Sequence, residues 1–571
     1  MANSLRELLL APQNPPRPAQ RVPAVVRRSE EFVLRLRDRA RPALGRFARP
    51  ARPSVREPYV RGETRLAKQL LLPALLGFLG SAAILLGASQ VNSPFTVKAV
   101  HGVPAWYFGI SPTTPTSTSS PAGVGLFLGI IAVFGGILLM LRAWYEVVRI
   151  TSRHPGVPVK MLVPIFIAWV LPLLVVAPLF SRDVYSYAAQ GEMMSHHISP
   201  YTYGPGLENG TPFGWLSDPL WWNVASPYGP FFLVLDGWIV SLTGHNALMS
   251  VELLRILALI GTVMFAVAVP VIARSFGRDG ATAFALAALN PLVLLHLVGG
   301  AHNDALMLGL VVVGYALARK GRPILGIVAC ALGALVKVPA LLVAVYIGWE
   351  WLGSGRTVRE RLRPVATALL IATSVMVAIS EMVGIGWGWI SGLSNPDAVR
   401  SYLDPATGLA LLSSRILQAV GLPSDTRLLI TLARGSGLAL AALIALYLIL
   451  RSERVGSLQA IGWTFLALVL LSPVVQPWYL TWGFVFLAPV AEGVVRRVLI
   501  IASGVACYLQ LPGGWTLLSE IGSANPWFVA AASLMLVAIA SALLLPRLRR
   551  RGTRAGVETV QVATAELGAS H

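Results

Sequence analysis

The sequence predicts an all-α, polytopic membrane protein, and its composition and hydropathy are the observations that indicate this class. Of the 571 residues, 55% are hydrophobic and only 13% are charged, and the mean hydropathy is +0.67. A soluble protein usually carries about 25% charged residues. Apolar runs long enough to cross a bilayer as helices recur from Leu70 to Leu545. We therefore expect the chain to span a membrane many times.

The positive charge supports the same interpretation. The formal net charge is +20, and Lys and Arg gather in the N-terminal arm, in short segments between apolar runs and in the tail after Pro546. An excess of these residues is typical of cytoplasmic segments. The charge therefore does not indicate a nucleic-acid partner, and membrane lipids are the expected surroundings.

Three regions follow from this distribution. Residues 1–66 are rich in Arg, Pro and Ala and lack the apolar stretch of a signal peptide, so we expect a largely disordered cytoplasmic arm. Residues 67–546 hold the apolar runs and form the expected membrane domain. Residues 547–571 are expected to be a basic cytoplasmic tail.

Charge bias also orients the first three predicted spans. The span near Ala67–Gly87 leads out of the cytoplasm to the loop 88–121, which has a single Lys and no Arg. The span near Gly123–Leu141 returns, and Met161–Phe180 leads out again. Asp183 would then lie on the extracytoplasmic side.

Residues 181–249 are expected to be the main extracytoplasmic loop, because they carry no strong basic cluster. The apolar run Phe231–Leu242 is short, and a crossing there would leave Arg274 and Arg278 outside. We therefore expect this run to lie in the headgroup plane as an interfacial helix.

The apolar run Ile324–Trp351 has basic residues on both sides, which places both of its ends in the cytoplasm. Two half-crossings that meet at Lys337 would satisfy this constraint, and Pro339 supplies the helix break. Lys337 would then lie toward the same external face as Asp183. With the remaining apolar runs, the expected total is about fourteen crossings with both termini in the cytoplasm.

This topology brings the polar residues at membrane depth to the outer ends of the spans. Ionisable residues at such depth are costly and usually functional. Snorkelling or a loop position would explain any single one of them. As a set they predict an extracytoplasmic cavity lined by Asp183, His302, Asn303, Asp304, Lys337, Arg400, Gln476, Trp478 and Tyr479.

The sequence also limits the chemistry of such a site. It contains no P-loop and no dinucleotide-binding glycine motif, so we expect no nucleotide cofactor. An activated donor outside the cytoplasm would come from a lipid carrier, whose phosphate a cation such as Lys337 would stabilise. An aspartate opposite it would deprotonate an incoming hydroxyl. Cys330 and Cys507 lie in apolar runs and no D-x-D pair surrounds Asp183, so we expect metal independence.

Several motifs carry a family resemblance. The stretches S-R-D-V-Y-S-Y-A-A-Q-G, S-P-Y-G-P, G-G-A-H-N-D, V-K-V-P and S-P-V-V-Q-P-W-Y-L-T-W occur in this order between Ser181 and Trp482. Together they resemble the actinobacterial polyprenyl-phosphate-mannose-dependent α-(1→6)-mannosyltransferases. These are integral membrane enzymes of the GT-C type that build the mannan core of lipomannan and lipoarabinomannan.

The resemblance implies a fold and a reaction. Residues 67–546 would form a GT-C type bundle that transfers mannose, with inversion, from a β-linked polyprenyl phosphate to the 6-hydroxyl of an α-mannan glycolipid. The essential aspartate that this type carries in its first large external loop maps to Asp183. The preceding loop, 88–121, has no carboxylate that could replace it.

The resemblance also suggests roles for the other residues. Arg182 would neighbour the base or contact phosphate, and Lys337 with Arg400 would receive the leaving phosphate. His302, Asn303 and Asp304 would bind sugar hydroxyls or hold Asp183 in place. Gln476 would also bind the substrate. The aromatic residues of the substrate-binding set would stack on sugar or lipid: Tyr185, Tyr187, Tyr201, Tyr228, Trp478 and Tyr479.

Other polar residues fit local structural roles better. His196 and His197 are interpreted as exposed loop histidines. Asp397 and Asp404 each neighbour a proline and are interpreted as turn residues.

Three alternatives remain open at this point. A related transferase would use another lipid-linked sugar, such as arabinose. A transporter or lipid flippase would predict inverted repeats and helices broken at the bilayer midplane, and we find no internal repeat. A non-catalytic subunit that binds polyprenyl phosphate would keep its role without Asp183. The oligomeric state is left open.

Overall fold

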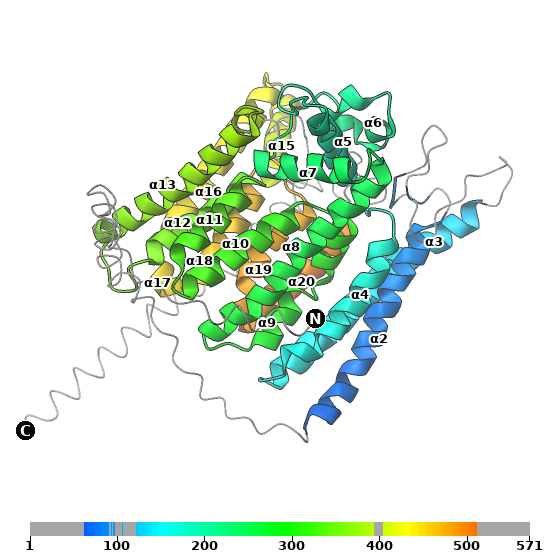
Figure 1. Cartoon of the computed structure of the whole chain (residues 1–571), viewed down its shortest axis with the longest axis vertical. Coiled ribbons are helices and arrows are strands. Elements are labelled where there is room, and N and C mark those ends of the chain that lie inside the picture. Colours follow the sequence, from blue (N-terminus) through cyan, green and yellow to red (C-terminus); the bar gives the residue numbers. More distant parts are fainter. Residues whose placement is uncertain are drawn as a thin grey trace, which may run out of the picture.

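The computed structural model describes residues 62–90, 93, 95–97, 106, 122–392 and 404–510. The regular structure in these ranges is helical and contains no β-strand, as expected for an all-α protein. The helices form one bundle, and α5 and α7 lie across one end of it (Figure 1). Most of the predicted N-terminal arm, the C-terminal tail, the apolar run 528–545 and Arg400 with Asp397 fall outside the described residues. Residues 62–66, assigned to the arm from the sequence, form the start of the first helix.

Within the described residues, five helices are long and apolar enough to cross a membrane, and a bent pair would make a sixth span. Even the shortest of the five, with 25 residues, is about 37 Å long at ~1.5 Å per residue, which exceeds the hydrocarbon thickness of about 30 Å. These helices are α2 (Gly62–Ala88), α3 (Ala122–Arg153), α8 (Ala247–Ser275), α13 (Val358–Val383) and α16 (Thr426–Leu450).

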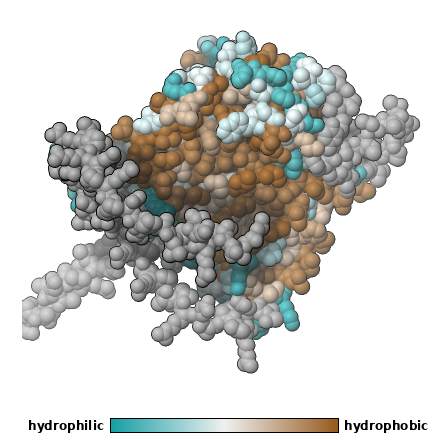
Figure 2. Space-filling model, in the orientation of Figure 1, coloured by the Kyte–Doolittle hydropathy of each residue, from teal (hydrophilic) through white to brown (hydrophobic). Residues whose placement is uncertain are grey.

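The surface agrees with a membrane location. Hydrophobic side chains cover the middle of the molecule, and more polar ones gather at the end where α5 (Asp183–Ser195) and α6 (Pro212–Leu216) lie (Figure 2). Exposed Leu, Ile, Val and Phe side chains on the long helices have no water-facing role and fit a lipid environment. The chain is a membrane protein.

Other apolar segments fold as shorter helices, so the long helices alone do not reach the expected count of about fourteen crossings. These shorter helices are α4 (Val163–Val175), α7 (Pro230–Leu242), α11 (Pro323–Ala334), α12 (Leu341–Glu350), α18 (Ser457–Leu471), α19 (Leu480–Leu487) and α20 (Gly493–Leu509).

The apolar run 281–297 is interrupted in the structure. Helix α9 (Gly280–Ala287) ends early, and the chain resumes as the π-helix η5 (Val293–Gly299). The interruption lies at Asn290-Pro291, where proline cannot donate a backbone hydrogen bond and the Asn290 side chain accepts one from Leu292 N at 3.0 Å. A sharp bend of 113° then separates η5 from α10 (Asp304–Arg319).

The helix break predicted at Lys337 is confirmed. Helix α11 ends at Ala334, Lys337 has an extended backbone, and the short 3₁₀ turn η6 (Val338–Ala340) leads into α12. The extended conformation agrees with the restriction that Pro339 imposes on the backbone before it.

Glycine lets α10 lie very close to α8. A Cβ atom on Gly261 would lie 2.4 Å from the backbone of Ala305, which leaves no room for any side chain. Small residues at helix crossings are typical of membrane bundles. This contact sets the position of the first turn of α10, which begins at Asp304.

A buried arginine connects three elements next to the bent pair. The Arg255 side chain on α8 is fully buried, and its guanidinium donates hydrogen bonds to the carbonyls of Leu174 at 2.8 Å, Val176 at 2.6 Å and Gly299 at 3.4 Å. The guanidinium also lies 4.6 Å from the ring centroid of Trp106. Carbonyls at helix ends lack partners within their own helix, and a cation there satisfies them.

We expect Arg255→Met to destabilise the protein by about 3 kcal/mol or more, because buried carbonyls lose their donors. Thermal unfolding of the purified protein in detergent would measure the change. Arg274→Met, which removes an exposed arginine from the same helix, is the matched control. Equal unfolding temperatures for the two variants would contradict this role of Arg255.

Candidate active site

Four separate segments meet near the end of the bundle that α5 and α7 cover. They are the start of α5 with Asp183, the turn before α10 with His302, the helix break at Lys337, and the 3₁₀ turn η8 (Pro477–Tyr479). Direct contacts join the first two, since His302 Nδ1 lies 3.4 Å from Asp183 Oδ2. The Asp183 side chain is 22% exposed, whereas His302 is fully buried. Asp183 is therefore held by the protein on one side and open on another.

The local backbone explains the position of Asp183. Phe180 has a positive φ of 65°, which turns the chain after the apolar segment, and its N–H donates to Phe95 O at 2.9 Å. The Ser181 hydroxyl accepts a hydrogen bond from Asp183 N at 3.1 Å. Asp183 is the first residue of α5, where the helix dipole stabilises a negative charge.

The neighbours of Asp183 determine its charge. Burial raises the pKa of Asp183, but the contact with His302 and the positive charge of Lys337 lower it, and the net result lies below the ordinary value. The carboxylate is therefore ionised at neutral pH, which is the form that accepts a proton.

Aromatic stacking holds the imidazole of His302. Its ring centroid lies 3.9 Å from that of Trp478, with an angle of 20° between the planes. Trp478 also stacks on His296 of the π-helix η5 at 5.6 Å. These contacts fix the ring orientation and therefore the side of His302 that faces Asp183.

A buried ion pair forms the second half of the site. Lys337 Nζ lies 2.7 Å from Asp304 Oδ2, and Trp482 Nε1 donates to Asp304 Oδ1 at 2.7 Å. Asp304 is fully buried and Lys337 is 12% exposed. Both carboxylate oxygens of Asp304 are thus engaged by the protein itself.

Aromatic rings surround the Lys337 ammonium. It lies 4.9 Å from the ring centroid of Tyr479 and 5.8 Å from those of Tyr228 and Trp482. Such rings stabilise a cation through their π faces. Asp304 and the three rings together stabilise the ammonium at this depth in the bundle.

Tyr187 and Tyr228 connect the two halves. The Tyr187 hydroxyl lies 3.5 Å from Asn303 Oδ1, and the two tyrosine rings make an edge contact at 5.2 Å. Tyr201 donates to the carbonyl of Tyr228 at 2.9 Å. Burial raises the pKa values of Tyr187 and Tyr228 well above the ordinary value, so both phenols stay neutral hydrogen-bond donors.

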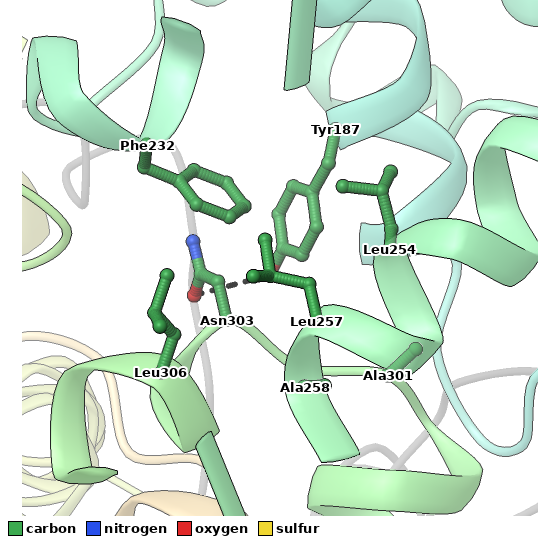
Figure 3. Close-up of a pocket in the computed structure, with 8 residues that line it drawn as sticks. All are labelled: Tyr187, Phe232, Leu254, Leu257, Ala258, Ala301, Asn303 and Leu306. Carbon is green, nitrogen blue, oxygen red and sulfur yellow. Dashed lines mark hydrogen bonds between the residues drawn. The ribbon is translucent and has the colours of Figure 1, made fainter. Parts of the chain in front are cut away.

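A small pocket lies beside Tyr187 and Asn303 (Figure 3). It is bounded mainly by apolar side chains, including Phe232, Leu254 and Leu306, and it has no room for a water molecule. It is a packing gap and cannot receive a sugar.

The structure places the remaining predicted residues in different surroundings. Arg182 points toward the end of α6, with Nη1 3.5 Å from Ser217 O. Tyr185 is buried and interacts electrostatically with Arg255 and Arg182. Gln476 precedes η8 in an extended conformation, and its buried Oε1 has no hydrogen-bond partner.

Asp404 caps α15 (Pro405–Ala419) and therefore has the local role expected of it. Its Oδ1 accepts from Ala406 N at 2.9 Å.

Sequence reasoning missed Arg255, His296 and Trp482. Trp482 ends the motif S-P-V-V-Q-P-W-Y-L-T-W. Its spacing of three and four residues from Tyr479 and Trp478 on a helical segment places it on the same face. Arg255, a lone arginine inside an apolar run, was also recognisable as a costly buried charge.

Two family models match most of the described membrane domain. The model described as "Alpha-(1->6)-mannopyranosyltransferase, N-terminal domain" matches residues 74–353. The model described as "MptB C-terminal domain" matches residues 406–545. The first match includes Asp183, His302, Asp304 and Lys337.

Curated relatives agree with these models. Alpha-(1->6)-mannopyranosyltransferase A of Mycobacterium tuberculosis is 33% identical over 460 residues, which cover 77% of this chain and 84% of the relative. Alpha-(1->6)-mannopyranosyltransferase B of Corynebacterium glutamicum is 30% identical over 481 residues, which cover 78% of this chain and 77% of the relative. No solved structure shows significant similarity to the chain. The resemblance carried by the motifs is therefore confirmed, and the chain belongs to the family of alpha-(1->6)-mannopyranosyltransferases.

Proposed function

We propose that this membrane enzyme transfers mannose from polyprenyl-phosphate-mannose to the 6-hydroxyl of an α-mannan glycolipid. Mannosyl transfer follows from the family. One observation supports the choice of donor. The partly exposed carboxylate of Asp183 and the ammonium of Lys337, which Asp304 and aromatic rings surround, both lie at one end of an apolar bundle. A lipid-linked donor would bring its phosphate to such a site from the bilayer.

The proposed reaction is a single inverting displacement. Asp183 takes the proton of the acceptor 6-hydroxyl as its oxygen attacks the anomeric carbon of the mannose. The bond between that carbon and the phosphate oxygen breaks, and polyprenyl phosphate leaves with the electron pair. Attack opposite the leaving group converts the β-linked donor into an α-linked product.

Lys337 would stabilise the negative charge that develops on the departing phosphate. Asp304 and the three aromatic rings would hold the ammonium in place between turnovers. His302 would orient Asp183, and Arg182 and Arg400 would be additional phosphate contacts. Nothing in this reaction needs a metal ion or an organic cofactor.

We propose further that the site faces the extracytoplasmic side, in a GT-C type bundle of about fourteen crossings with both termini in the cytoplasm. The charge bias of the sequence supports this orientation, because α5 and α6 follow a span that is predicted to lead out of the cytoplasm. The product would extend the mannan core of lipomannan or lipoarabinomannan.

Asp183→Asn should reduce mannose transfer by about 100-fold or more, because the amide cannot accept the proton. The assay would use membranes containing the protein, polyprenyl-phosphate-mannose and a short α-(1→6)-mannoside. Asp425→Asn is the matched control, since Asn also caps a helix and Asp425 caps α16 away from the site. Unchanged activity in Asp183→Asn would exclude Asp183 as the base. A wild type inactive with this donor but active with polyprenyl-phosphate-arabinose would contradict the proposed sugar.

Lys337→Met should abolish transfer and also destabilise the fold by about 3 kcal/mol, because Asp304 is left buried without its partner. The double variant Lys337→Met with Asp304→Asn should recover much of the unfolding temperature and stay inactive. Unfolding temperature and transfer rate would be measured on the same preparations. Recovery of activity together with stability would mean that Lys337 acts only in folding.

The pH dependence of kcat/KM should report the lowered pKa of Asp183. Because this pKa lies below 3.8, protonation of Asp183 should not reduce the rate between pH ~5 and ~8. Ionised Asp183 contributes fully to stability above the pKa that it has in the unfolded chain. This contribution is lost as the pH falls through the lower pKa that Asp183 has in the folded protein. His302→Asn removes a cause of the lowering, so its acidic limb should move to higher pH. Identical acidic limbs in both proteins would contradict the assigned role of His302.

A further inference from the structure

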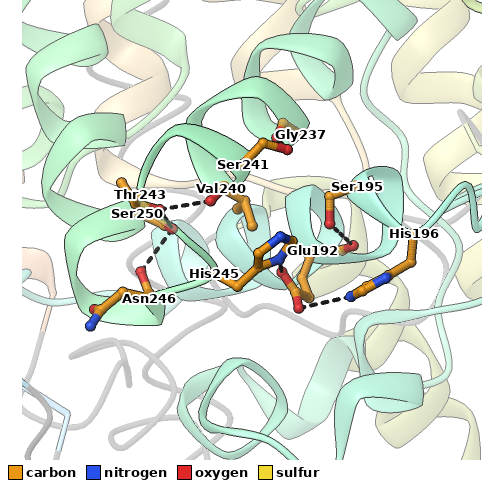
Figure 4. Close-up of polar contacts among 10 residues, drawn as sticks. All are labelled: Glu192, Ser195, His196, Gly237, Val240, Ser241, Thr243, His245, Asn246 and Ser250. Atoms are coloured by element: carbon orange, nitrogen blue, oxygen red, sulfur yellow. Dashed lines mark hydrogen bonds and ion pairs between the residues drawn. The ribbon is translucent and has the colours of Figure 1, made fainter.

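Asp183 begins α5, and a second polar cluster lies at the other end of this helix. Figure 4 shows Glu192, His196 and His245 directed toward one another. His196 Nε2 lies 3.1 Å from Glu192 Oε1, and His245 Nδ1 lies 2.8 Å from Glu192 Oε2. The two imidazole rings stack with their centroids 5.4 Å apart. The Glu192 side chain is 9% exposed, and both histidines face the surface. Two histidines therefore converge on one buried carboxylate.

Helix periodicity places two of these three side chains together. Glu192 and His196 are four residues apart at the end of α5, so their side chains lie on one face of the helix. The sequence predicts that His196 is an exposed loop histidine. It is exposed, as expected, but the structure joins it to Glu192.

The turn between α7 and α8 supplies the third group. His245 N donates to Val240 O at 3.1 Å and Gly244 N donates to Ser241 O at 3.2 Å, which is the hydrogen-bond pattern of a Schellman motif. Asn246, the next residue, caps α8. His245 itself has a positive φ of 61°, a strained conformation that two helix ends hold in place. Its ring is thus directed toward Glu192 before any ligand binds.

The spacing fits a small transition-metal ion. Nitrogen and carboxylate oxygen bind Zn²⁺ at about 2.0–2.2 Å, so two ligands of a tetrahedral ion lie roughly 3.3 Å apart. The observed contacts of 2.8 and 3.1 Å are close to this value, and the three candidate ligand atoms all lie within 4.8 Å of one another. Two imidazoles and one carboxylate are a ligand set that zinc accepts, with a fourth position left for water or another group.

A second carboxylate lies nearby. Burial raises the pKa of Glu208, the negative charge of Glu192 raises it further, and His196 lowers it. Glu208 belongs to the 3₁₀ turn η3 (Pro205–Glu208), which contacts α5.

Among the described residues, Glu192, His196 and His245 form the one group of three with the spacing of metal ligands.

We propose that Glu192, His196 and His245 bind a divalent transition-metal ion, best matched by Zn²⁺. The bound ion would link the end of α5 to the turn between α7 and α8. Glu192 is nine residues from Asp183, about 13 Å along the helix at ~1.5 Å per residue. The ion would therefore stabilise the helix that carries Asp183 without taking part in transfer.

The test uses the full-length chain, purified in detergent without a histidine tag, stripped with EDTA and then incubated with zinc sulfate. Elemental analysis after desalting should give about one zinc per chain, and zinc should raise the unfolding temperature of the stripped protein. His245→Asn and Glu192→Gln should weaken zinc binding by more than about tenfold. Replacing a residue that only hydrogen-bonds to a metal ligand already lowers the metal affinity by about that factor.

His197→Asn is the matched control. His197 is the exposed neighbour of His196, has a similar positive φ of 59°, and contributes no ligand atom to the group. Asn tolerates this conformation at both positions, so neither replacement strains the backbone further. The control should bind zinc as the wild type does.

Stripped wild type that takes up no zinc, or that gains no stability from it, would overturn the proposal. Equal zinc affinity in the wild type and in His245→Asn would also overturn it. These measurements do not depend on mannose transfer, so they test the metal site separately from the proposed function.

Discussion

The ion pair between Lys337 and Asp304 is the interaction on which the candidate active site depends. A charge inside an apolar bundle is stable only with an opposite charge and further hydrogen bonds around it. Asp304 has both, because Lys337 and Trp482 engage its two oxygens. Each partner lies where a helix is broken or begins. The pair therefore determines how the break at Lys337 and the start of α10 face each other, and with them the position of His302 beside Asp183.

Breaking helices inside an apolar bundle leaves backbone groups without partners, and the structure satisfies several of them with side chains. Arg255 donates to three carbonyls at the ends of α4 and η5, and Asn290 accepts from the backbone beside Pro291. Strain is located at the same places. Within the described ranges, the four non-glycine residues with positive φ are Phe180, His197, His245 and Ala301. Phe180 and Ala301 adjoin the active-site segments, whereas His245 belongs to the cluster around Glu192 and His197 adjoins it. Strained backbone is typical of functional sites.

Helix α5 joins the two sites. Asp183 is its first residue, and Glu192 and His196 are in its last turns and at its end. Just before Glu192 it packs on α7 so closely that a Cβ on Gly191 would lie 2.6 Å from the carbonyl oxygen of Asp236. A general base is effective only when its distance from the reacting hydroxyl is held within a few tenths of an ångström. A metal ion at one end of this helix and the ordered turn at Ser181 at the other would restrict the same rigid body from both sides.

The sequence by itself determined the class of protein, the family and the identity of the main polar residues. Composition and hydropathy require a membrane bundle, and the order of short motifs from Ser181 to Trp482 is specific enough to identify the family. It also located the helix break at Lys337, because proline acts locally. Tertiary structure decided the pairings: Lys337 with Asp304, His245 with Glu192, and Asp183 with His302, which the resemblance offered only as one of two roles for His302. These partners lie 33, 53 and 119 residues apart in the chain. Their proximity results from packing and bent helices, and neither periodicity nor charge bias contains that information.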